Sequence, residues 1–422
     1  MNSFTFRSGV RRIGFVVAAV LLMTVGYWLL KTTRSDVRAQ TMLGDPIPNL
    51  TSREMTIFGG GFQSFIHIWD PAQGLGPVFT QDACSVCHAS PAVGGNSTNK
   101  ATFFGTINTD GTFNPLTNEG GMFLQPKSVQ IFKPACILKG ERIPADATII
   151  ATHQPPQVFG LGLIDNIPDG QISANAIDKG QGVHGITNMV PDQNGKVKIG
   201  RFGLKAQFAT LEQAAASALQ HDIGITNPLF PTEDLPSGQP IPPNCSIKTE
   251  PNDNGSMMLD GYHYVVYLAP NTPGSVNTNG QAKFNSVGCN LCHIAPNGST
   301  PAFTTKAKVI IPVTFQGTTL ESAALEQQPV NPYSDFLLHD MGSMLGDNLP
   351  EGLATGTMFR TAPLWGLSSR ISNGNGLLHD GRAKTVMDAI EDHGGEATTV
   401  LGNFNTLSMQ DQMDLIAFIS SL

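Results

Sequence analysis

Residues 79–91, FTQDACSVCHASP, contain a Cys-x-x-Cys-His motif, and residues 284–296, FNSVGCNLCHIAP, contain it again in the same local frame. Each copy has a phenylalanine five residues before its first cysteine and a proline three residues after its histidine. Two thiols three positions apart can each add to one vinyl group of a haem, and the adjacent histidine can then bind the iron. The repeated motif therefore predicts two covalently bound haem c groups and two cytochrome-like units.

A redox pair or half of a zinc site is the alternative for each pair of cysteines. A zinc site built from both motifs would not require a histidine directly after the second cysteine in each copy. We therefore expect six residues to hold haem, with the two histidines as iron ligands: Cys84, Cys87 and His88 for the first group, and Cys289, Cys292 and His293 for the second.

The length of 422 residues is sufficient for two domains with substantial cores. We expect a mainly α-helical fold of two cytochrome c-like helical domains, with long loops and small β elements. Residues 41–245 would form the first haem domain and residues 246–422 the second. Charged residues are 14% of the chain against about 25% in typical proteins, and there are 45 glycines and 29 prolines, so loops should be extensive. Residues 94–121, rich in Gly, Asn and Thr, are interpreted as a surface loop.

The N-terminal residues 1–40 have the pattern of an export segment. Arg7, Arg11 and Arg12 precede an apolar run over residues 13–30. This run is intermediate between the core of a signal peptide and a full membrane span, so both a cleaved signal peptide and an N-terminal membrane anchor remain open. In either case we expect a periplasmic protein, soluble or anchored to the inner membrane.

The charge and the remaining cysteines limit the partners and the compartment. A net charge of −8 argues against a nucleic-acid partner, because no basic patch is available to displace phosphate counterions. Cys136 and Cys245 are the two cysteines outside the motifs, and export to an oxidising compartment favours a disulfide between them. Two unpaired buried thiols are the alternative.

Two more elements repeat in the same order after each motif. Residues 155–168, PPQVFGLGLIDNIP, resemble residues 362–367, APLWGL, and residues 210–221 resemble residues 385–393. The second pair has helical composition and begins with a threonine suited to capping a helix. Three shared landmarks in one order indicate a duplication.

Three other segments have recognisable local patterns. Residues 257–268 predict an apolar helix, and residues 308–315, KVIIPVTF, predict a short strand or extended arm. At the C-terminus Ser408 is placed to cap a last helix with an apolar stripe, which should close the second domain.

Several longer motifs resemble one family. GLGPVFTQDACSVCH, GRFGLKA at residues 200–206, PYSDFLLHDMG at residues 332–342, and FRTAPLWGL with LLHDGRAKTVMDAIEDHGGEA are similar to the dihaem oxidoreductases labelled thiol oxidoreductases. That family is a branch of the bacterial dihaem cytochrome c peroxidase superfamily. The similarity extends from about Phe58 to the C-terminus. All four motif cysteines should be consumed by haem thioethers, so the label does not imply a dithiol active site.

The resemblance implies a peroxidase-like redox enzyme. In the peroxidases the C-terminal haem accepts electrons from a donor and passes them to the N-terminal haem, where peroxide binds. The implied partners are therefore a redox donor protein or small electron carrier, and peroxide or another oxidant. Some relatives hold a calcium ion between the domains, so Ca²⁺ is a further candidate cofactor, although no ligands are evident here.

The resemblance also suggests axial ligands. In the peroxidases the helix after the second HDGR element supplies the sixth ligand of the second haem, and the same place in this chain is His393. Met341 is the alternative ligand, and Met341 or His339 could instead only line the pocket. The corresponding position in the first repeat is Ala218, which cannot bind iron, so the distal face of the first haem should be open.

An acid follows at a short distance in the peroxidases, and its place here falls on Asp222. A carboxylate there can take a proton from one peroxide oxygen and return it to the other, which is general acid/base catalysis. Alternatively, Asp222 caps a helix or turn. His221, His153 and His184 are alternative distal ligands, and a permanent ligand among them would close the site.

One position departs from the family pattern. The peroxidases have a tryptophan between the haems where this chain has Leu204, and Trp365 or Trp69 is left either to replace it or to pack as a core aromatic against a haem edge. Arg382 of the HDGRA motif is implied as a propionate partner, and His379 of the same motif as a residue that orders water.

Two other functions remain open from the sequence. One is a non-enzymatic dihaem electron-transfer protein with both irons six-coordinate. The other is oxidative modification of a protein or polymer substrate. An open iron near Ala218 with Asp222 beside it favours catalysis, whereas a persistent distal histidine favours electron transfer.

Overall fold

The computed structural model describes residues 42–245, 250–271 and 273–422, and residues 41–422 form one compact unit. The predicted export segment, residues 1–40, lies outside the described residues. Among the residues that are described, no helix has both the length and the apolar character needed to cross a membrane.

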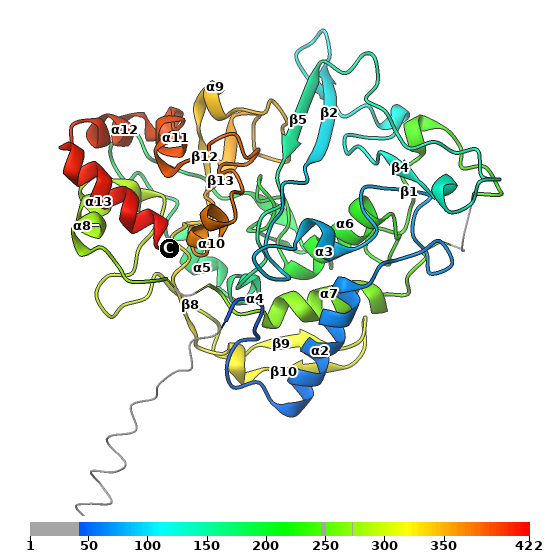
Figure 1. Ribbon diagram of the computed structural model, residues 1–422, viewed down its shortest axis with the longest axis horizontal. Helices are drawn as coiled ribbons and strands as arrows, with labels where there is room; N and C mark the ends of the chain where they lie inside the picture. Colours follow the sequence, from blue (N-terminus) through cyan, green and yellow to red (C-terminus); the bar gives the residue numbers. More distant parts are fainter. Residues whose placement is uncertain (1–41, 246–249, 272) are drawn as a thin grey trace, which may run out of the picture. The chain divides into compact units, whose positions relative to one another are not determined.

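Short helices are separated by long connections (Figure 1). The α-helices are α2 (Ser52–Ile66), α3 (Cys84–Cys87), α4 (Leu161–Asp165), α5 (Asp169–Ser173), α6 (Leu211–Ile223), α7 (Ser256–Tyr267), α8 (Thr278–Val287), α9 (Gly342–Leu345), α10 (Leu367–Ser372), α11 (Val386–Glu391), α12 (Thr398–Asn405) and α13 (Met409–Ser420). The 3₁₀ turns are η1 (Thr117–Glu119), η2 (Val129–Ile131), η3 (Pro236–Gly238), η4 (Cys289–Leu291), η5 (Ala323–Leu325) and η6 (Gly395–Ala397).

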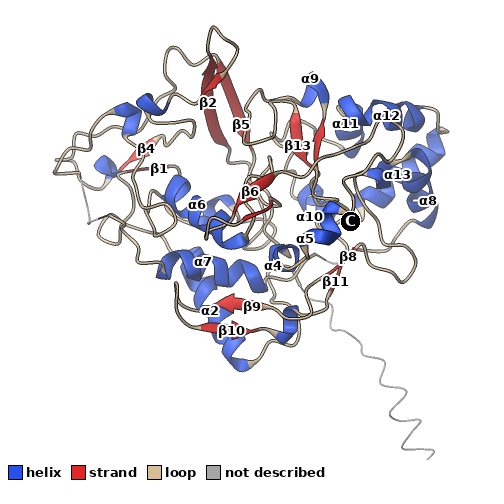
Figure 2. Ribbon diagram, turned by 180° about the vertical axis from the view of Figure 1, so that it is seen from behind, coloured by secondary structure: helices blue, strands red, loops and turns tan. Residues whose placement is uncertain are grey.

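The strands form six small sheets (Figure 2). The three-stranded sheet has the order β3 (Phe113–Asn114), β2 (Ala101–Ile107), β5 (Ile149–His153). The two-stranded sheets pair β1 (Val78–Phe79) with β4 (Lys127–Ser128), β6 (Met189–Pro191) with β7 (Val197–Ile199), β8 (Phe303–Thr304) with β11 (Pro329–Val330), β9 (Ile310–Pro312) with β10 (Thr319–Glu321), and β12 (Leu338–Asp340) with β13 (Met358–Arg360). All these pairs are antiparallel.

The prediction of a mainly α-helical fold is wrong. Helix accounts for 31% of the chain and strand for 15%, with several small sheets. The segment 94–121, which was expected to be a surface loop, contains β2 and β3, and β2 pairs with β5 from Ala101 opposite His153 to Gly105 opposite Ile149. The reason is that long connections satisfy their backbone hydrogen bonds by pairing with one another, and this pairing is non-local.

Two helix pairs organise the two halves of the structure. Helix α2 packs against α7, and α8 packs against α13, so the helix before each motif contacts a helix that follows the motif at a long distance in the sequence (Figures 1 and 2). Each crossing depends on a glycine. A Cβ on Gly61 would overlap the Tyr264 amide of α7, and a Cβ on Gly280 would overlap the Asp414 carbonyl of α13. The absence of a side chain therefore allows the two backbones to approach.

The apolar cores follow these helix pairs. The larger core includes Phe58, Phe65 and Tyr264 from the α2–α7 pair, and a second core includes Phe284 and Phe418 from the α8–α13 pair. Helix α7 confirms the helix expected over residues 257–268, and it packs on α2 although it follows residue 245. The predicted division at residue 245 stays a prediction.

The repeated elements are visible in the structure. Gly160 and Gly366, at matching places in the two repeats, both precede a short helix with a positive φ, 72° and 76° respectively. A Cβ on Gly160 would contact Trp365 at 2.7 Å, and a Cβ on Gly366 would overlap the Gln157 side chain. Since each glycine faces a residue of the other repeat, the two turns pack against each other reciprocally.

Local capping follows the expected residues. The side chains of Thr210 and Thr385 cap α6 and α11, and Ser408 caps α13. The structure also pairs Cys136 with Cys245, which confirms the disulfide. The caps and the disulfide could be predicted from the sequence because each depends on a few neighbouring residues or on the number of cysteines.

Candidate functional site

A cavity of about 480 Å³ is lined by residues of both halves of the chain. Both motif histidines, His88 and His293, face it, together with His393 and Trp365. Its remaining lining is largely apolar, with side chains such as Phe202, Leu204, Phe284, Leu364, Leu377 and Phe404. A concave apolar space with a few convergent polar groups is the usual form of a cofactor site.

The two motif histidines are held in the same way. Nδ1 of His88 lies 3.1 Å from the Gly95 carbonyl oxygen, and Nδ1 of His293 lies 2.8 Å from the Tyr333 carbonyl oxygen. A ring that donates its Nδ1–H to a carbonyl keeps the lone pair of Nε2 for a metal. Burial lowers the pKa of both rings, that of His293 to about 4, which favours the neutral form that a metal ligand requires.

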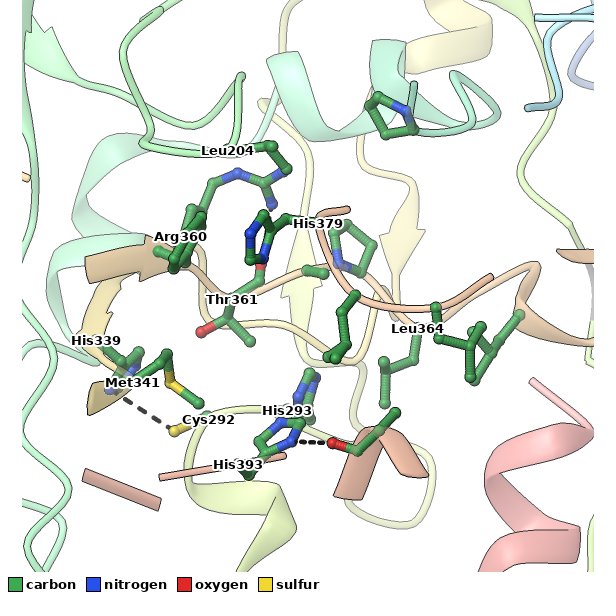
Figure 3. A pocket seen from close by; sticks show the side chains of 18 of the residues that line it. Leu204, Cys292, His293, His339, Met341, Arg360, Thr361, Leu364, His379 and His393 are labelled. Carbon is green, nitrogen blue, oxygen red and sulfur yellow. Dashed lines mark hydrogen bonds between the residues drawn. The ribbon is translucent and has the colours of Figure 1, made fainter. Parts of the chain in front are cut away.

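His393 lies close to His293 in the cavity (Figure 3). It follows α11, its Nδ1 lies 2.6 Å from the Ala389 carbonyl oxygen, and burial lowers its pKa. His393 therefore has the same Nδ1–carbonyl arrangement as the two motif histidines. Met341 also lines the cavity. The choice between His393 and Met341 as sixth ligand stays a prediction.

His339 lines the cavity as a charged side chain. Its Nε2 lies 3.0 Å from Asp335 Oδ2 and its Nδ1 lies 2.8 Å from Glu396 Oε2. Burial lowers the pKa of His339, but hydrogen bonds to Asp335, Cys292 and Glu396 outweigh it and raise the pKa to about 11. Since both ring nitrogens donate to carboxylates, His339 is a cation and not an iron ligand in this arrangement.

One cluster of metal-ligating side chains was found among the described residues, Cys292, Asp335 and His339, with donor atoms within 4.8 Å of one another. A thiol and an imidazole are unlike the oxygen ligands that calcium prefers. Because both nitrogens of His339 are already bonded, we assign no metal to this cluster, and the predicted calcium ion stays a prediction.

The first motif lies against the end of α6. The amide groups of Thr80 and Gln81 donate to the Asp222 carbonyl oxygen at 2.8 and 3.0 Å. Burial raises the pKa of Cys84 and of Cys87 to about 12, and the Asp222 carboxylate contributes to both rises. The Asp222 side chain is therefore close to both thiols of the motif, and burial raises its own pKa to about 7.

One face of α6 is directed toward open space near the first motif. Ala214 lines the cavity, Ala218 is exposed, and Asp222 lies beside the motif cysteines. Residues four apart lie on the same face of a helix. The place that corresponds to His393 in the first repeat is therefore occupied by a side chain that cannot bind iron.

The three alternative distal histidines do not line the cavity. His153 Nε2 lies 3.0 Å from Asp347 Oδ2, and His221 Nδ1 lies 2.9 Å from the Ser217 carbonyl oxygen. The His184 side chain is 64% exposed and lies beside Glu396. His153 is thus bonded to a carboxylate and His184 is exposed, whereas His221 has the same Nδ1–carbonyl arrangement as the motif histidines and stays an alternative distal ligand of the first haem.

Of the residues that could lie between the two motifs, three line the cavity and one does not. Leu204 and Trp365 both line the cavity, and Trp365 is buried. His379 also lines it and stacks on Phe359, with ring centroids 4.4 Å apart, and burial lowers the pKa of His379 to about 4. Trp69 lies elsewhere, in edge contact with His67.

A buried ion-pair cluster lies behind His379. Lys205 is fully buried, and its Nζ lies 2.9 Å from Asp347 Oδ1 and 3.7 Å from the centroid of the Phe359 ring. The other carboxylate oxygen of Asp347 is bonded to His153, whose ring contacts that of His379 edge to face. Burial lowers the pKa of Lys205, although its neighbour Asp347 acts in the opposite direction. The cluster fixes the wall of the cavity on this side.

Arginines give the clearest difference from the sequence expectations. The Arg382 side chain is 40% exposed, its Nε lies 2.7 Å from Asp380 Oδ2, and it does not line the cavity. Three other arginines do line it: Arg201, Arg360 and Arg370. A single arginine carries no periodic signal, so the sequence pattern did not mark these positions.

Comparisons with known proteins give one family match. A family model described as "Di-haem oxidoreductase, putative peroxidase" matches residues 137–256 and 264–422, which leaves the first motif outside the match. No curated protein matched the chain. Among solved structures, hydrazine synthase of Kuenenia stuttgartiensis pressurised with 20 bar xenon is 13% identical, with 89% of this chain and 90% of that chain covered and a TM-score of 0.40. That score is too low to carry an argument. By the family match, which spans more than half of its length, the chain belongs to the di-haem oxidoreductase family.

Proposed function

We propose that this chain is an exported c-type dihaem enzyme that reduces a peroxide. Cys84 and Cys87 would attach the first haem, with His88 as its iron ligand, and Cys289, Cys292 and His293 would hold the second in the same way. When bound, the two haems would supply the redox chemistry, with electrons from a donor entering at the C-terminal group and passing to the N-terminal group, where the peroxide is reduced.

The difference between the repeats is the observation that carries this proposal. At the second motif His393 lies close to His293 and has a free Nε2. At the first motif the matching position on α6 is Ala218, an exposed residue with no donor atom. One iron would then have two protein ligands, and the other would keep an open position for substrate.

Asp222 is proposed as the acid/base residue at the open position. A carboxyl group with a pKa of about 7 can both accept and donate a proton near neutral pH. Its carboxylate would take the proton from one peroxide oxygen and return it to the other as the O–O bond breaks. The overall reaction consumes two electrons and two protons and releases water and an alcohol, or two waters from hydrogen peroxide.

The periplasmic compartment and the redox partners are also part of the proposal. The N-terminal sequence pattern and the Cys136–Cys245 disulfide support export to an oxidising periplasm, with or without a membrane anchor. The electron source is proposed to be a redox donor protein or a small electron carrier that delivers electrons to the second haem.

Electron paramagnetic resonance of the holoprotein poised with one haem reduced tests the proposal. The open first site should give a high-spin ferric signal, and adding hydrogen peroxide should remove it. A protein with only low-spin signals in the one-electron-reduced state would instead be an electron carrier with two six-coordinate haems, and the enzyme proposal would fail.

A further inference from the structure

Two partly buried arginines in the cavity wall have no carboxylate partner among the described residues. Arg360, at the end of β13, donates from Nε to the Gly203 carbonyl oxygen at 2.9 Å and from Nη1 to the Thr361 carbonyl oxygen at 2.9 Å. Arg370, on α10, donates from Nε to the Gly376 carbonyl oxygen at 2.7 Å. All these acceptors are neutral.

The second amino group of Arg370 also meets only neutral atoms. Its Nη2 lies 3.0 Å from Gln154 Oε1 and 3.3 Å from the Leu378 carbonyl oxygen. Burial lowers the pKa of both Arg360 and Arg370 to about 10, which still leaves both guanidinium groups charged at neutral pH.

The carboxylate that acts on Arg360 is already occupied. Asp335 contributes to the pKa of Arg360, but its oxygens are bonded to His339 and Lys179, and to the hydroxyl of Thr361. No ion pair within 4.0 Å joins the two residues in the part of the chain that is described. A charge that is partly withdrawn from water and has no counter-ion is unfavourable, so a negative group should complete this wall.

The other two arginines near the site behave differently. Arg201 also lines the cavity but forms an ion pair with Asp169. Arg382 is partly exposed and paired with Asp380. Both therefore have the counter-ion that Arg360 and Arg370 lack.

The two unpartnered arginines lie where the halves of the chain meet. Arg360 bonds to Gly203 and Arg370 bonds to Gln154, so each reaches from the second repeat to the first. Figure 3 places Arg360 near Leu204 and His379 in the cavity. Both motif histidines line the same cavity, so negative groups bound to these arginines would lie between the two histidines' parts of the cavity.

We propose that Arg360 and Arg370 bind the propionate carboxylates of the haem groups. Each haem carries two propionates, and the contacts above leave Nη2 of Arg360 and Nη1 of Arg370 to donate charge-assisted hydrogen bonds to a carboxylate. These arginines would replace Arg382 in the role that the sequence resemblance suggested. The proposal rests on haem binding, which the family establishes, and not on peroxide reduction.

Redox titration of the holoprotein tests this assignment. The variants are R360Q and R370Q, with R382Q as the matched control, and both midpoint potentials are followed by visible spectroscopy between pH 5 and pH 9. A nearby cation favours the reduced haem, because reduction lowers the positive charge of the iron. R360Q and R370Q should therefore each lower at least one midpoint potential, and the potential should depend more strongly on pH as the released propionate titrates.

The control and a conservative variant define the outcomes. R382Q should keep both potentials, and R370K should recover part of the loss in R370Q because it restores the charge without the planar fork. If a glutamine variant fails to load haem, the lysine variants at both positions are titrated instead. Potentials in R360Q and R370Q that match those of R382Q at every pH would overturn the proposal.

A free organic carboxylate is the other source of the same chemistry. Acetate added to the holoprotein should leave its spectrum and potentials unchanged if propionates already occupy both arginines. A saturable acetate-induced spectral change that is lost in R360Q or R370Q would assign the two arginines to a free anion and contradict the haem assignment.

Discussion

Replacing Asp222 by asparagine should separate its catalytic role from its cost to stability. The Asn side chain keeps nearly the same shape but cannot exchange a proton near neutral pH. General acid/base catalysis typically contributes about 10²–10⁴-fold, so kcat/KM for hydrogen peroxide should fall by about 10²-fold or more at pH 7. Haem content should not change, because Asp222 is neither a thioether residue nor an iron ligand in the proposed site.

Asp222→Asn should lower activity but raise the free energy of unfolding. Burial raises the pKa of Asp222 from 3.8 to about 7, a shift of about three units at about 1.4 kcal/mol each. Below pH 3.8 the carboxyl is protonated in both states and costs nothing. Between pH 3.8 and 7 the unfolded chain ionises first, so stability falls as pH rises, and above pH 7 the full cost of about 4 kcal/mol is present. Asp222→Asn removes this cost.

Two measurements on the same variant therefore test the reasoning. Denaturant unfolding should show an advantage of the variant that grows from below about 2 kcal/mol at pH 5 to about 4 kcal/mol at pH 8. Asp234→Asn, at an acid whose side chain is 39% exposed, is the control and should leave both turnover and this pH trend unchanged. Wild-type turnover in Asp222→Asn would remove the acid/base role, and a pH-independent stability difference would refute the buried environment assigned to this carboxyl.

Four further substitutions address the ligand, the helix packing and the buried ion pair. His393→Ala should convert the second haem to a high-spin spectrum and stop electron input, whereas an unchanged low-spin spectrum would point to Met341 or another ligand. Gly280→Ala should reduce the free energy of unfolding by about 1–3 kcal/mol, because the added Cβ overlaps α13 at the α8–α13 crossing. Its control is Gly59→Ala, which has open space at the Cβ position and should be neutral or slightly stabilising in denaturant unfolding. Lys205→Met should cost about 3–5 kcal/mol in the same assay, because it leaves a buried carboxylate without its cation; a cost below about 1 kcal/mol would contradict the buried pair.

Local chemistry explains which features the sequence could predict. The two motifs, the caps Thr210 and Thr385, and the disulfide each depend on residue type and short spacing. Strand β9 falls within residues 308–315, the segment expected to be a strand or extended arm, and its partner β10 lies beyond that segment. These signals are local, so no knowledge of the tertiary structure is needed to read them.

Non-local pairing explains what was missed. The strand β2 lies in a Gly- and Asn-rich stretch, and its partner β5 is distant in the sequence. The pairing of β2 with β5 depends on where these two segments meet in the folded chain. It therefore leaves no hydrophobic period of two or 3.6 residues in the sequence. Arg360 and Arg370 were missed for the same reason, since the absence of a counter-ion is visible only after the chain has folded.

The reciprocal packing of the repeats constrains how the two sites can differ. Gly160 faces Trp365, and Gly366 faces Gln157, so a change to either turn disturbs the other half as well. Divergence of function is less constrained at positions outside this contact, and Ala218 on α6 and His393 after α11 are of this kind. In the proposed function, a duplicated scaffold with a shared centre would keep both cofactor sites in place, while a single residue in each repeat would decide whether the iron beside it is closed or open.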